Sequence, residues 1–384
     1  MNRIIKIIFF LVLSHFLLNL NAAMGQEKIK IGLLIPMTGL NKELGESIIK
    51  AVRLAVKDID SDLIEIIPKD TNTKPEKTLQ SALELKDRGI KIVIGPVFHK
   101  SLLYLDQVQD LTFLSLTNKT LDLPSNVISA GINSTSQFNT IKKFLQINEI
   151  KKTLFLTPIK DYEFEIKEGI KKSKIKIFKE YAYNSDPTKL TNQIEEITNY
   201  KIRKQNLEDE INRVKNSIDA NKEKKIKRLE QKYSLGGLNF EAIVISDFNE
   251  SLKSVCTSLL YTDVSPKKKY FITLNQWFDV SLQSETDIQP LYYPSINKKN
   301  FEDFKDKFFK EFNKYPSHLS LLSYDLVGLV YYLSSKTNLS NIEKIFKNKN
   351  SFKGKIGIFE IKNKKINHKL NFYKIENNET IKIF

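Results

Sequence analysis

Three hydroxyl side chains and one glycine follow short apolar runs in the N-terminal half of the chain, and they are Thr38, Gly39, Ser101 and Thr117. A hydroxyl at the end of a strand can cap the next helix, or it can hydrogen-bond a carboxylate beside free backbone N–H groups. Helix capping is the favoured interpretation of Ser101. Glycine lets the backbone approach a ligand or adopt a positive φ, and plain turn chemistry explains it equally well. The chemistry predicted for this set is recognition of a small polar ligand.

Large aromatic side chains stand at comparable places farther along the chain. Tyr162 and Trp277 could stack on a ligand or close over it, as large aromatic residues on loops often do. Packing between two lobes is the alternative, and it is the favoured interpretation of Trp277.

Catalysis has no comparable set of residues. Four histidines, His15, His99, His318 and His368, are isolated, and neither their spacing nor a cysteine pair indicates a metal site. The chain contains no G-x-S-x-G motif, no phosphate-binding P-loop and no complete dinucleotide-binding glycine motif. We therefore expect no cofactor, no metal and no enzymatic activity.

The N-terminus has the pattern of a secretory signal peptide over residues 1–25. A basic start is followed by an apolar run from Ile7 to Leu20 and then by small residues. This run is shorter than the roughly 20 residues that span a membrane, and no cysteine follows it that could carry a lipid anchor. We expect a mature chain that is periplasmic and not embedded in a membrane.

The composition is typical of a folded protein with more than one domain. Of the 384 residues, 41% are hydrophobic and 28% are charged. The single Cys256 excludes an internal disulfide and fits a small buried hydrophobic side chain. The formal net charge of +16 is spread along the chain, which argues against nucleic-acid binding. An anionic partner outside the cytoplasm, such as cell-wall polymer or lipid headgroups, stays open.

Short apolar runs alternate with segments of helical periodicity over most of the chain. The pattern predicts strands at 29–35, 63–68, 91–94, 112–116, 153–157, 174–183, 242–246 and 270–274, and helices at 42–59, 75–88, 101–109, 137–147 and 164–172. Such alternation is typical of an α/β fold with doubly wound parallel sheets, in which ligands bind at the carboxyl ends of the strands. We predict two such lobes around a ligand cleft, the first from residues 27–132 and 296–366 and the second from 133–295 and 367–384.

The stretch from residue 188 to 235 departs from this pattern. It is dense in Lys, Glu and Asn, and coiled-coil spacing runs through Leu207, Ile211, Val214 and Ile218. The spacing breaks around residues 219–225 and then resumes, so we predict a helical hairpin inserted in the second lobe. A solvated extension and a docking surface for a partner protein are both open interpretations of it.

Several short motifs, taken in order, resemble the type I periplasmic binding proteins. They are Lys30-Ile-Gly-Leu-Leu-Ile-Pro-Met-Thr-Gly39, Gly95-Pro96, Phe113-Leu-Ser-Leu-Thr-Asn118, Asn275-Gln-Trp277, Phe301 to Pro316 and Ser323-Tyr-Asp-Leu-Val327. The family includes leucine-, isoleucine- and valine-binding proteins, and the chain most resembles its penicillin-binding protein activator subfamily. The resemblance covers nearly the whole mature chain and implies the two-lobed fold.

The resemblance also implies where a ligand would lie. The carboxylate of an amino acid would bind near Phe98 to Ser101 and Thr117, which agrees with the open N–H groups expected at those strand ends. With the aromatic residues across the cleft, the predicted ligand-binding set is Thr38, Gly39, Phe98, Ser101, Thr117, Tyr162, Asp247, Gln276 and Trp277.

Two positions depart from the amino-acid binders of this family. These proteins usually carry an acidic residue near Asn275 and Gln276 to receive the ligand's ammonium group, and Asp247 and Asp279 are the nearby substitutes here. Glu163 stands where the family commonly has a glycine. Both departures argue against binding of an α-amino acid.

Two functions follow from these features. The first is an exported solute-binding protein of the leucine or branched-chain amino-acid type, which holds a small polar ligand between its lobes for an ABC permease. The second is a non-transport activator or scaffold of peptidoglycan synthases that uses the same fold. The whole fold favours solute binding, whereas the helical insertion and the strand end at Phe113 to Asn118 favour the activator.

Overall fold

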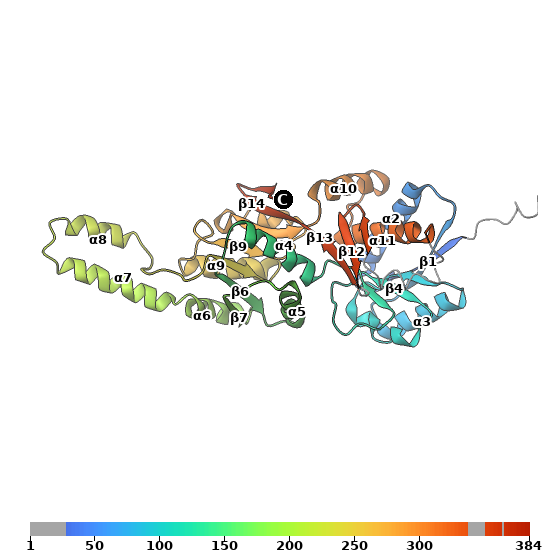
Figure 1. Cartoon of the computed structure of the whole chain (residues 1–384), viewed down its shortest axis with the longest axis horizontal. Coiled ribbons are helices and arrows are strands. Elements are labelled where there is room, and N and C mark those ends of the chain that lie inside the picture. The colour runs from blue at the N-terminus through green and yellow to red at the C-terminus, as the bar shows by residue number, and fades with distance from the viewer. Residues whose placement is uncertain (1–27, 337–349, 363–364) are drawn as a thin grey trace, which may run out of the picture.

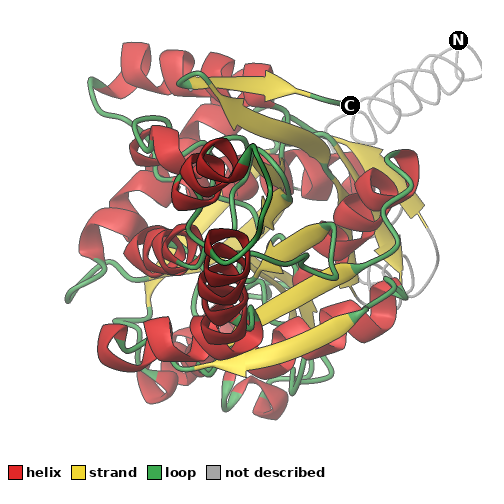
Figure 2. Cartoon of the chain, turned by 90° about the vertical axis from the view of Figure 1, so that its left-hand side faces the viewer, coloured by secondary structure: helices red, strands yellow, loops and turns green. Residues whose placement is uncertain are grey.

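The computed structural model describes residues 28–336, 350–362 and 365–384, and the predicted signal peptide at 1–25 lies outside them. Figure 1 shows two lobes side by side along the long axis, with a helical arm extending from the far end of the second lobe. Figure 2 looks along that axis and shows helices around the strands. Within these three ranges, no helix combines the length and the apolar character needed to cross a bilayer.

The first lobe is built on an eight-stranded sheet in the order β11-β12-β13-β5-β4-β3-β1-β2. Its strands are β1 (Ile29–Ile35), β2 (Ile64–Asp70), β3 (Ile92–Ile94), β4 (Thr112–Ser115), β5 (Val127–Ser129), β11 (Asn350–Lys353), β12 (Ile358–Lys362) and β13 (Lys365–Lys369). Strands β1 to β5 are parallel, so their carboxyl ends share one edge. One face is covered by α2 (Lys42–Ile59), α10 (Lys298–Phe312) and α11 (His318–Ser334), and the other by α3 (Pro75–Asp87).

The second lobe repeats this arrangement with a seven-stranded sheet in the order β15-β14-β10-β9-β8-β6-β7. Its strands are β6 (Thr153–Pro158), β7 (Lys179–Tyr183), β8 (Ala242–Ile245), β9 (Tyr270–Thr273), β10 (Leu291–Ser295), β14 (Asn371–Glu376) and β15 (Glu379–Lys382). One face is covered by α4 (Ser134–Ile147) and α5 (Glu163–Ser173), and the other by α6 (Pro187–Ile197) and α9 (Asn249–Tyr261). The predicted α/β class with two doubly wound lobes is confirmed.

The chain crosses between the lobes three times, from β5 to α4, from β10 to α10 and from β13 to β14. Strand β13 ends at Lys369, so the first sheet continues past the boundary predicted at 366. Asn133 ties two crossings together, because its Oδ1 accepts from Ser136 N at 2.9 Å and caps α4 while its Nδ2 donates to Ile366 O at 2.9 Å.

Two predicted elements differ from the structure. Residues 101–109 form no α-helix but two short 3₁₀ turns, His99–Leu102 and Leu105–Gln107. Leu102 and Leu105 of these turns and Val108 directly after them are buried and recur every three positions, which is the period of a 3₁₀ turn. The strand predicted at 174–183 begins only at Lys179, because α5 ends in a left-handed residue at Lys174.

The arm is a hairpin of α7 (Tyr200–Lys215) and α8 (Lys222–Glu230). Helix α6 packs into the second lobe, so the part that leaves the lobe is shorter than the predicted insertion at 188–235. Leu207 and Val214 are buried along the predicted coiled-coil face, whereas Ile218 in the connecting turn is fully exposed. At the base of the arm, the Arg203 guanidinium donates to Thr262 O and Leu235 N donates to Arg203 O at 2.9 Å.

Cys256 lies in α9 and is fully buried in the second core, as the sequence predicts. Burial raises the pKa of its thiol to about 12, so the group stays protonated and unreactive at neutral pH.

His368 packs between two crossings, and its environment fixes its protonation. Its Nε2 lies 2.9 Å from Ala130 O and must donate there, while Nδ1 is buried without a partner among the described residues. Burial lowers the pKa of His368 to about 4, although the hydrogen bond to Ala130 raises it in part. A proton on Nδ1 would place an uncompensated charge in the interior.

We predict that His368 makes the fold sensitive to acid. Between pH 6.5 and about 4 the unfolded chain protonates this group and the folded chain does not, so stability is lost as pH falls through that window. Urea unfolding of His368→Gln, which keeps a donor for Ala130, should show a pH dependence smaller by about 3 kcal/mol. Parallel pH profiles for the variant and the wild type would contradict this.

Candidate ligand site between the lobes

A cavity of about 360 Å³ lies between the lobes, among segments that follow parallel strands of both sheets. Its lining residues are Val97, Phe98, His99, Leu116, Thr117, Asn118, Lys119, Gly131, Ile132, Gln137, Phe248, Asn275, Trp277, His318, Leu319 and Leu322. Pockets that bind small molecules have volumes of roughly 300 to 1,000 Å³. The cavity is therefore suited to a ligand about the size of an amino acid.

A strained loop after β9 places Trp277 against the first lobe. Trp277 and Phe278 have φ angles of 50° and 61°, which are uncommon for bulky residues and costly to hold. The Trp277 ring stacks on His318 at the start of α11, with 4.7 Å between ring centroids and 25° between planes. Burial lowers the pKa of His318, so its imidazole is neutral at neutral pH. Trp277 thus packs between the lobes and lines the cavity at once.

Asn275 holds this loop and offers a donor to the cavity. Its Oδ1 accepts from Trp277 N at 3.0 Å and from Ser295 Oγ at 2.8 Å, and its backbone N–H donates to Gln137 Oε1 at 2.7 Å. No described residue accepts a hydrogen bond from its Nδ2. That N–H₂ group is therefore available to a ligand.

The residues that line the cavity are positively charged or neutral. Lys119 is partly buried in the lining and forms no ion pair with a described residue. Thr117 lies beside it, with its Oγ1 accepting from Lys119 N at 3.3 Å. None of the described residues that line the cavity is Asp or Glu. A ligand carboxylate finds donors here, whereas a ligand ammonium finds no carboxylate.

Asp247 is buried beneath this site, and its oxygens are already in use. Lys160 Nζ and Tyr162 OH donate to Oδ1 at 2.9 and 3.0 Å, and Tyr183 OH donates to Oδ2 at 2.7 Å. Burial alone raises the pKa of Asp247, but hydrogen bonds from Ser251, Tyr183 and Lys160 hold it below the usual value. Burial and the Asp247 charge raise the pKa of both tyrosines. Asp247 is therefore not free to receive an ammonium group.

The side chains of Gln276 and Tyr162 are also occupied by contacts within the protein. Gln276 Nε2 donates to Asp247 O at 3.1 Å, Thr273 Oγ1 at 3.2 Å and Leu274 O at 3.2 Å, and the side chain is buried. The Tyr162 ring packs edge-on against Phe248, with 5.8 Å between centroids. Neither residue lines the cavity in this structure.

Thr38, Gly39 and Ser101 lie outside the cavity lining. Thr38 Oγ1 donates to Asp70 Oδ2 at 2.6 Å. Gly39 has a φ of 77°, and a Cβ at this position would lie only 2.4 Å from Asn72 Oδ1. These two residues build the turn after β1. Ser101 sits within a 3₁₀ turn that Phe98 begins, so its interpretation as a helix cap is wrong.

The structure therefore brings together Phe98, Thr117 and Trp277 from the predicted set. Lys119, Asn275 and Phe248 join them without having been predicted as ligand-binding residues. Lys119 lies two residues after Thr117 in the segment that follows β4. Its position after a parallel strand is the feature of the sequence that could have identified it as a ligand-binding residue. Among the described residues, no group of three His, Cys, Asp or Glu side chains could hold a metal ion.

A buried carboxylate bridges the lobes beside the cavity. Glu165 of α5 accepts from the backbone N–H groups of Thr120 and Leu121, both at 2.8 Å, and from Thr120 Oγ1 at 3.1 Å. The two donors follow β4 of the first lobe, whereas Glu165 belongs to the second. Hydrogen bonds to a charged group are worth about 1.5 to 3 kcal/mol each. Glu165 therefore holds the lobes together at this edge.

Replacing Glu165 should open the cleft. Glu165→Gln removes the charge and leaves one oxygen for three donors, so we expect the Trp277–His318 stack to separate. Trp277 is the single tryptophan of the chain, and its fluorescence emission should shift to longer wavelength. Glu168→Gln is the matched control, because Glu168 pairs with Lys172 of the same helix. Equal spectra for the two variants would show that Glu165 does not hold the cleft.

Residues 28–199 match a family model described as periplasmic binding protein. No curated protein sequence matches the chain.

Solved structures share the fold at low sequence identity. The C-domain of LpoA from Haemophilus influenzae, a regulator of PBP1A, is 15% identical with a TM-score of 0.63, over 92% of this chain and 100% of that one. LivJ from Streptococcus pneumoniae, solved with isoleucine, is 16% identical with a TM-score of 0.55, over 93% and 100%. A solute-binding protein from Rhodopseudomonas palustris, solved with 3,4-dihydroxybenzoic acid, is 16% identical with a TM-score of 0.56, over 91% and 93%.

Full-length LpoA is longer than this chain, which covers 59% of it. The resemblance to type I periplasmic binding proteins is confirmed: the chain has their two-lobed fold, which these solute-binding proteins and the LpoA regulator share.

Proposed function

We propose that the chain is an exported solute-binding protein that holds a small carboxylate without an ammonium group between its lobes. The observation that carries the proposal is the polar lining of the cavity, which offers Lys119 and Asn275 Nδ2 as donors and, among the described residues, no acid. Aromatic rings of Phe98, Phe248 and Trp277 provide an apolar surface for the rest of the ligand.

The chemistry separates this ligand from an α-amino acid. Buried ammonium groups need a carboxylate or several acceptors, and Asp247 is already saturated. A carboxylate at Lys119 and Asn275 gains two charge-assisted hydrogen bonds. The dihydroxybenzoate carried by the Rhodopseudomonas protein has the same character, an aromatic carboxylate without an ammonium group. Delivery to an ABC permease by the closed form is part of this proposal.

Isothermal titration of the mature chain should show binding of a small aromatic carboxylate, such as benzoate or a hydroxybenzoate, and none of leucine or isoleucine. Asn275→Asp keeps the oxygen that holds the Trp277 loop but replaces the free donor with a negative charge. We expect it and Lys119→Gln each to weaken binding at least about tenfold, or about 1.4 kcal/mol.

Asn192→Asp is the matched control for Asn275→Asp, because it adds the same charge on the exposed side of α6. Leucine binding by the wild type, or carboxylate binding that is unchanged in Asn275→Asp, would refute the proposed ligand class.

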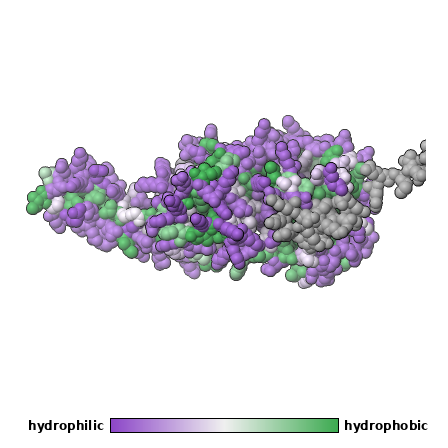
Figure 3. Space-filling view, in the orientation of Figure 1, coloured by the Kyte–Doolittle hydropathy of each residue, from purple (hydrophilic) through white to green (hydrophobic). Residues whose placement is uncertain are grey.

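The arm favours a second candidate function, that of a scaffold for a cell-wall synthase. A carrier of small solutes has no evident need of α7 and α8, which extend beyond the second lobe (Figure 1). Figure 3 shows the arm mostly hydrophilic with a hydrophobic patch at its end, where Ile218 is fully exposed. The fold is shared with LpoA, whose printed description is a regulator of PBP1A.

Shortening the arm tests this second function. Residues 209–229 can be replaced by a short Gly-Ser linker, which keeps Arg203 and its contact with Thr262 at the base. If the arm docks on a synthase, the shortened chain should lose binding to a purified bifunctional penicillin-binding protein on a biosensor surface. Ile218→Ser should weaken the same binding, and carboxylate affinity should stay unchanged in both. Equal synthase binding by shortened and intact chains, or none by the intact chain, would exclude the scaffold.

A further inference from the structure

The first lobe contains a second cavity, of about 720 Å³, away from the cleft. It lies between α2, α10, α11 and the β11–β12 hairpin, and it shares no lining residue with the cavity between the lobes. Its lining residues are Ala55, Asp58, Ile59, Asn300, Tyr324, Asp325, Gly328, Leu329, Tyr332, Ser351, Phe352, Lys353, Gly354, Lys355 and Phe359. The volume lies well within the range of small-molecule pockets.

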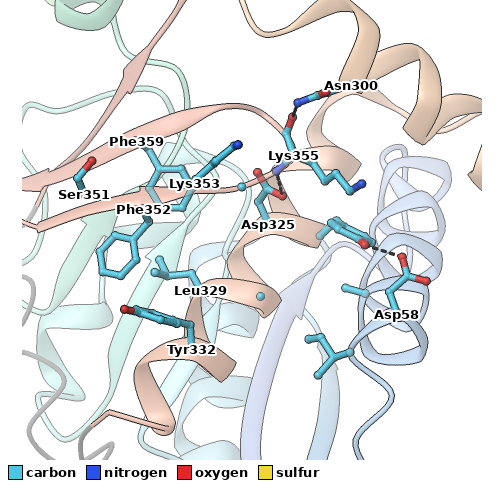
Figure 4. Close-up of a pocket in the computed structure, with 15 residues that line it drawn as sticks. Asp58, Asn300, Asp325, Leu329, Tyr332, Ser351, Phe352, Lys353, Lys355 and Phe359 are labelled. Carbon is cyan, nitrogen blue, oxygen red and sulfur yellow. Dashed lines mark hydrogen bonds between the residues drawn. The ribbon is translucent and has the colours of Figure 1, made fainter.

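The cavity has an apolar side and a polar side. Figure 4 shows Tyr332, Phe352 and Phe359 on one side of it and Asp58, Asn300 and Lys355 on the other. Tyr332 and Phe352 meet edge to face, with 5.5 Å between their ring centroids. Half of the Tyr332 surface is nevertheless exposed, so a ligand can still cover it. A surface of this kind suits a molecule with both an apolar and a polar end.

Gly328 keeps the cavity open from its position inside α11. A glycine in a helix interior lowers stability relative to alanine, so its presence in α11 needs a structural explanation. Close packing is not that reason, because a Cβ built on Gly328 meets no heavy atom within 4 Å. The missing side chain leaves empty space on the cavity wall.

Both acids of the lining already have partners. Asp58 forms an ion pair with Lys307 and accepts from Tyr324 OH, each at 2.5 Å. Asp325 is 7% exposed and accepts from the backbone N–H groups of Lys355 and Ile356, both at 2.8 Å. These bonds fix the turn of the hairpin to α11. Neither carboxylate is left to bind a cation.

Lys353 and Lys355 are the cations of the lining. Both are exposed, and neither forms an ion pair within 4 Å of its ammonium group among the described residues. Burial raises the pKa of Asp325 to about 6, and the backbone hydrogen bonds and the Lys355 charge offset this only in part. Lys307 neutralises Asp58, whose pKa stays below the usual value despite burial because of its hydrogen bonds to Lys307 and Tyr324. Positive charge beside an aromatic wall favours an anion with an apolar body.

We propose that this cavity binds an amphipathic carboxylate of the fatty-acid type, with its chain against the aromatic side and its carboxylate at Lys353 and Lys355. The inference rests on the first lobe alone and does not depend on the proposed function of the cleft. The space left by Gly328 accommodates the part of the chain nearest α11.

Dodecanoate below its micelle concentration is the probe, and isothermal titration of the full mature chain is the measurement. We expect saturable binding at one site. Gly328→Phe should fill the cavity and weaken binding at least about tenfold, whereas Gly328→Ala should leave it unchanged and raise Tm through better helix propensity. Circular dichroism checks that both variants fold.

Charge is tested separately from shape. The double variant Lys353→Gln with Lys355→Gln should weaken dodecanoate binding at least about tenfold, because two charge-assisted contacts are lost. Its backbone N–H at position 355 still reaches Asp325, so the hairpin is kept. Lys176→Gln, at an exposed lysine of the second lobe, is the control and should bind like the wild type. Dodecanol, which lacks the carboxylate, should bind at least about tenfold more weakly than dodecanoate.

The proposal would be overturned by no saturable binding of dodecanoate, or by wild-type affinity in a folded Gly328→Phe variant or in the folded double lysine variant. Equal affinity for dodecanol and dodecanoate would overturn it as well. Asn275→Asp, which alters the cavity between the lobes, should leave dodecanoate binding unchanged. Loss of binding in that variant would place dodecanoate in the cleft and would also overturn the proposal.

Discussion

Three crossings of the chain lie side by side between the lobes, and everything at the cleft depends on the hydrogen bonds that hold them. Asn133 uses both ends of its amide, one to start α4 and one to hold β13. His368 reaches back to Ala130 from β13. An unpaired polar group in such a place costs about 1 to 3 kcal/mol, so these contacts fix the register of the crossings. That register determines the shape of the cavity, because Gly131, Ile132 and Gln137 line it directly.

A saturated acid explains the electrostatics of the cleft. Asp247 stands at the end of β8, where a ligand's ammonium group could have been received, but Lys160, Tyr162 and Tyr183 consume its oxygens. The acid therefore joins three segments of the second lobe instead of facing a ligand. Burying this charge is tolerable because each oxygen has donors. What remains for the cavity is the donor capacity of Lys119 and Asn275.

The fold could be predicted from the sequence far better than the site. Apolar periodicity is local, and it identified α2 and the strands β1 to β4 and β6 to β9, whereas β5 and β10 to β15 were not predicted. It failed at residues 101–109, where a three-residue period belongs to 3₁₀ turns. Site residues depend on contacts between distant segments: Asp247 and Gln276 turn inward, and Glu165 reaches Thr120 across the lobes. Nothing in the sequence near Asp247 shows that Tyr183 will lie beside it.

The arm has a mechanical consequence. At about 1.5 Å per residue, α7 alone reaches roughly 24 Å, and the Arg203 contact with Thr262 joins its base to the second lobe. Such a helix acts as a lever whose fulcrum is the set of crossings between the lobes. A small rotation of one lobe against the other displaces the tip in proportion to its distance from that fulcrum. Any rotation between the lobes would therefore move the tip of the arm through a larger distance than the walls of the cavity.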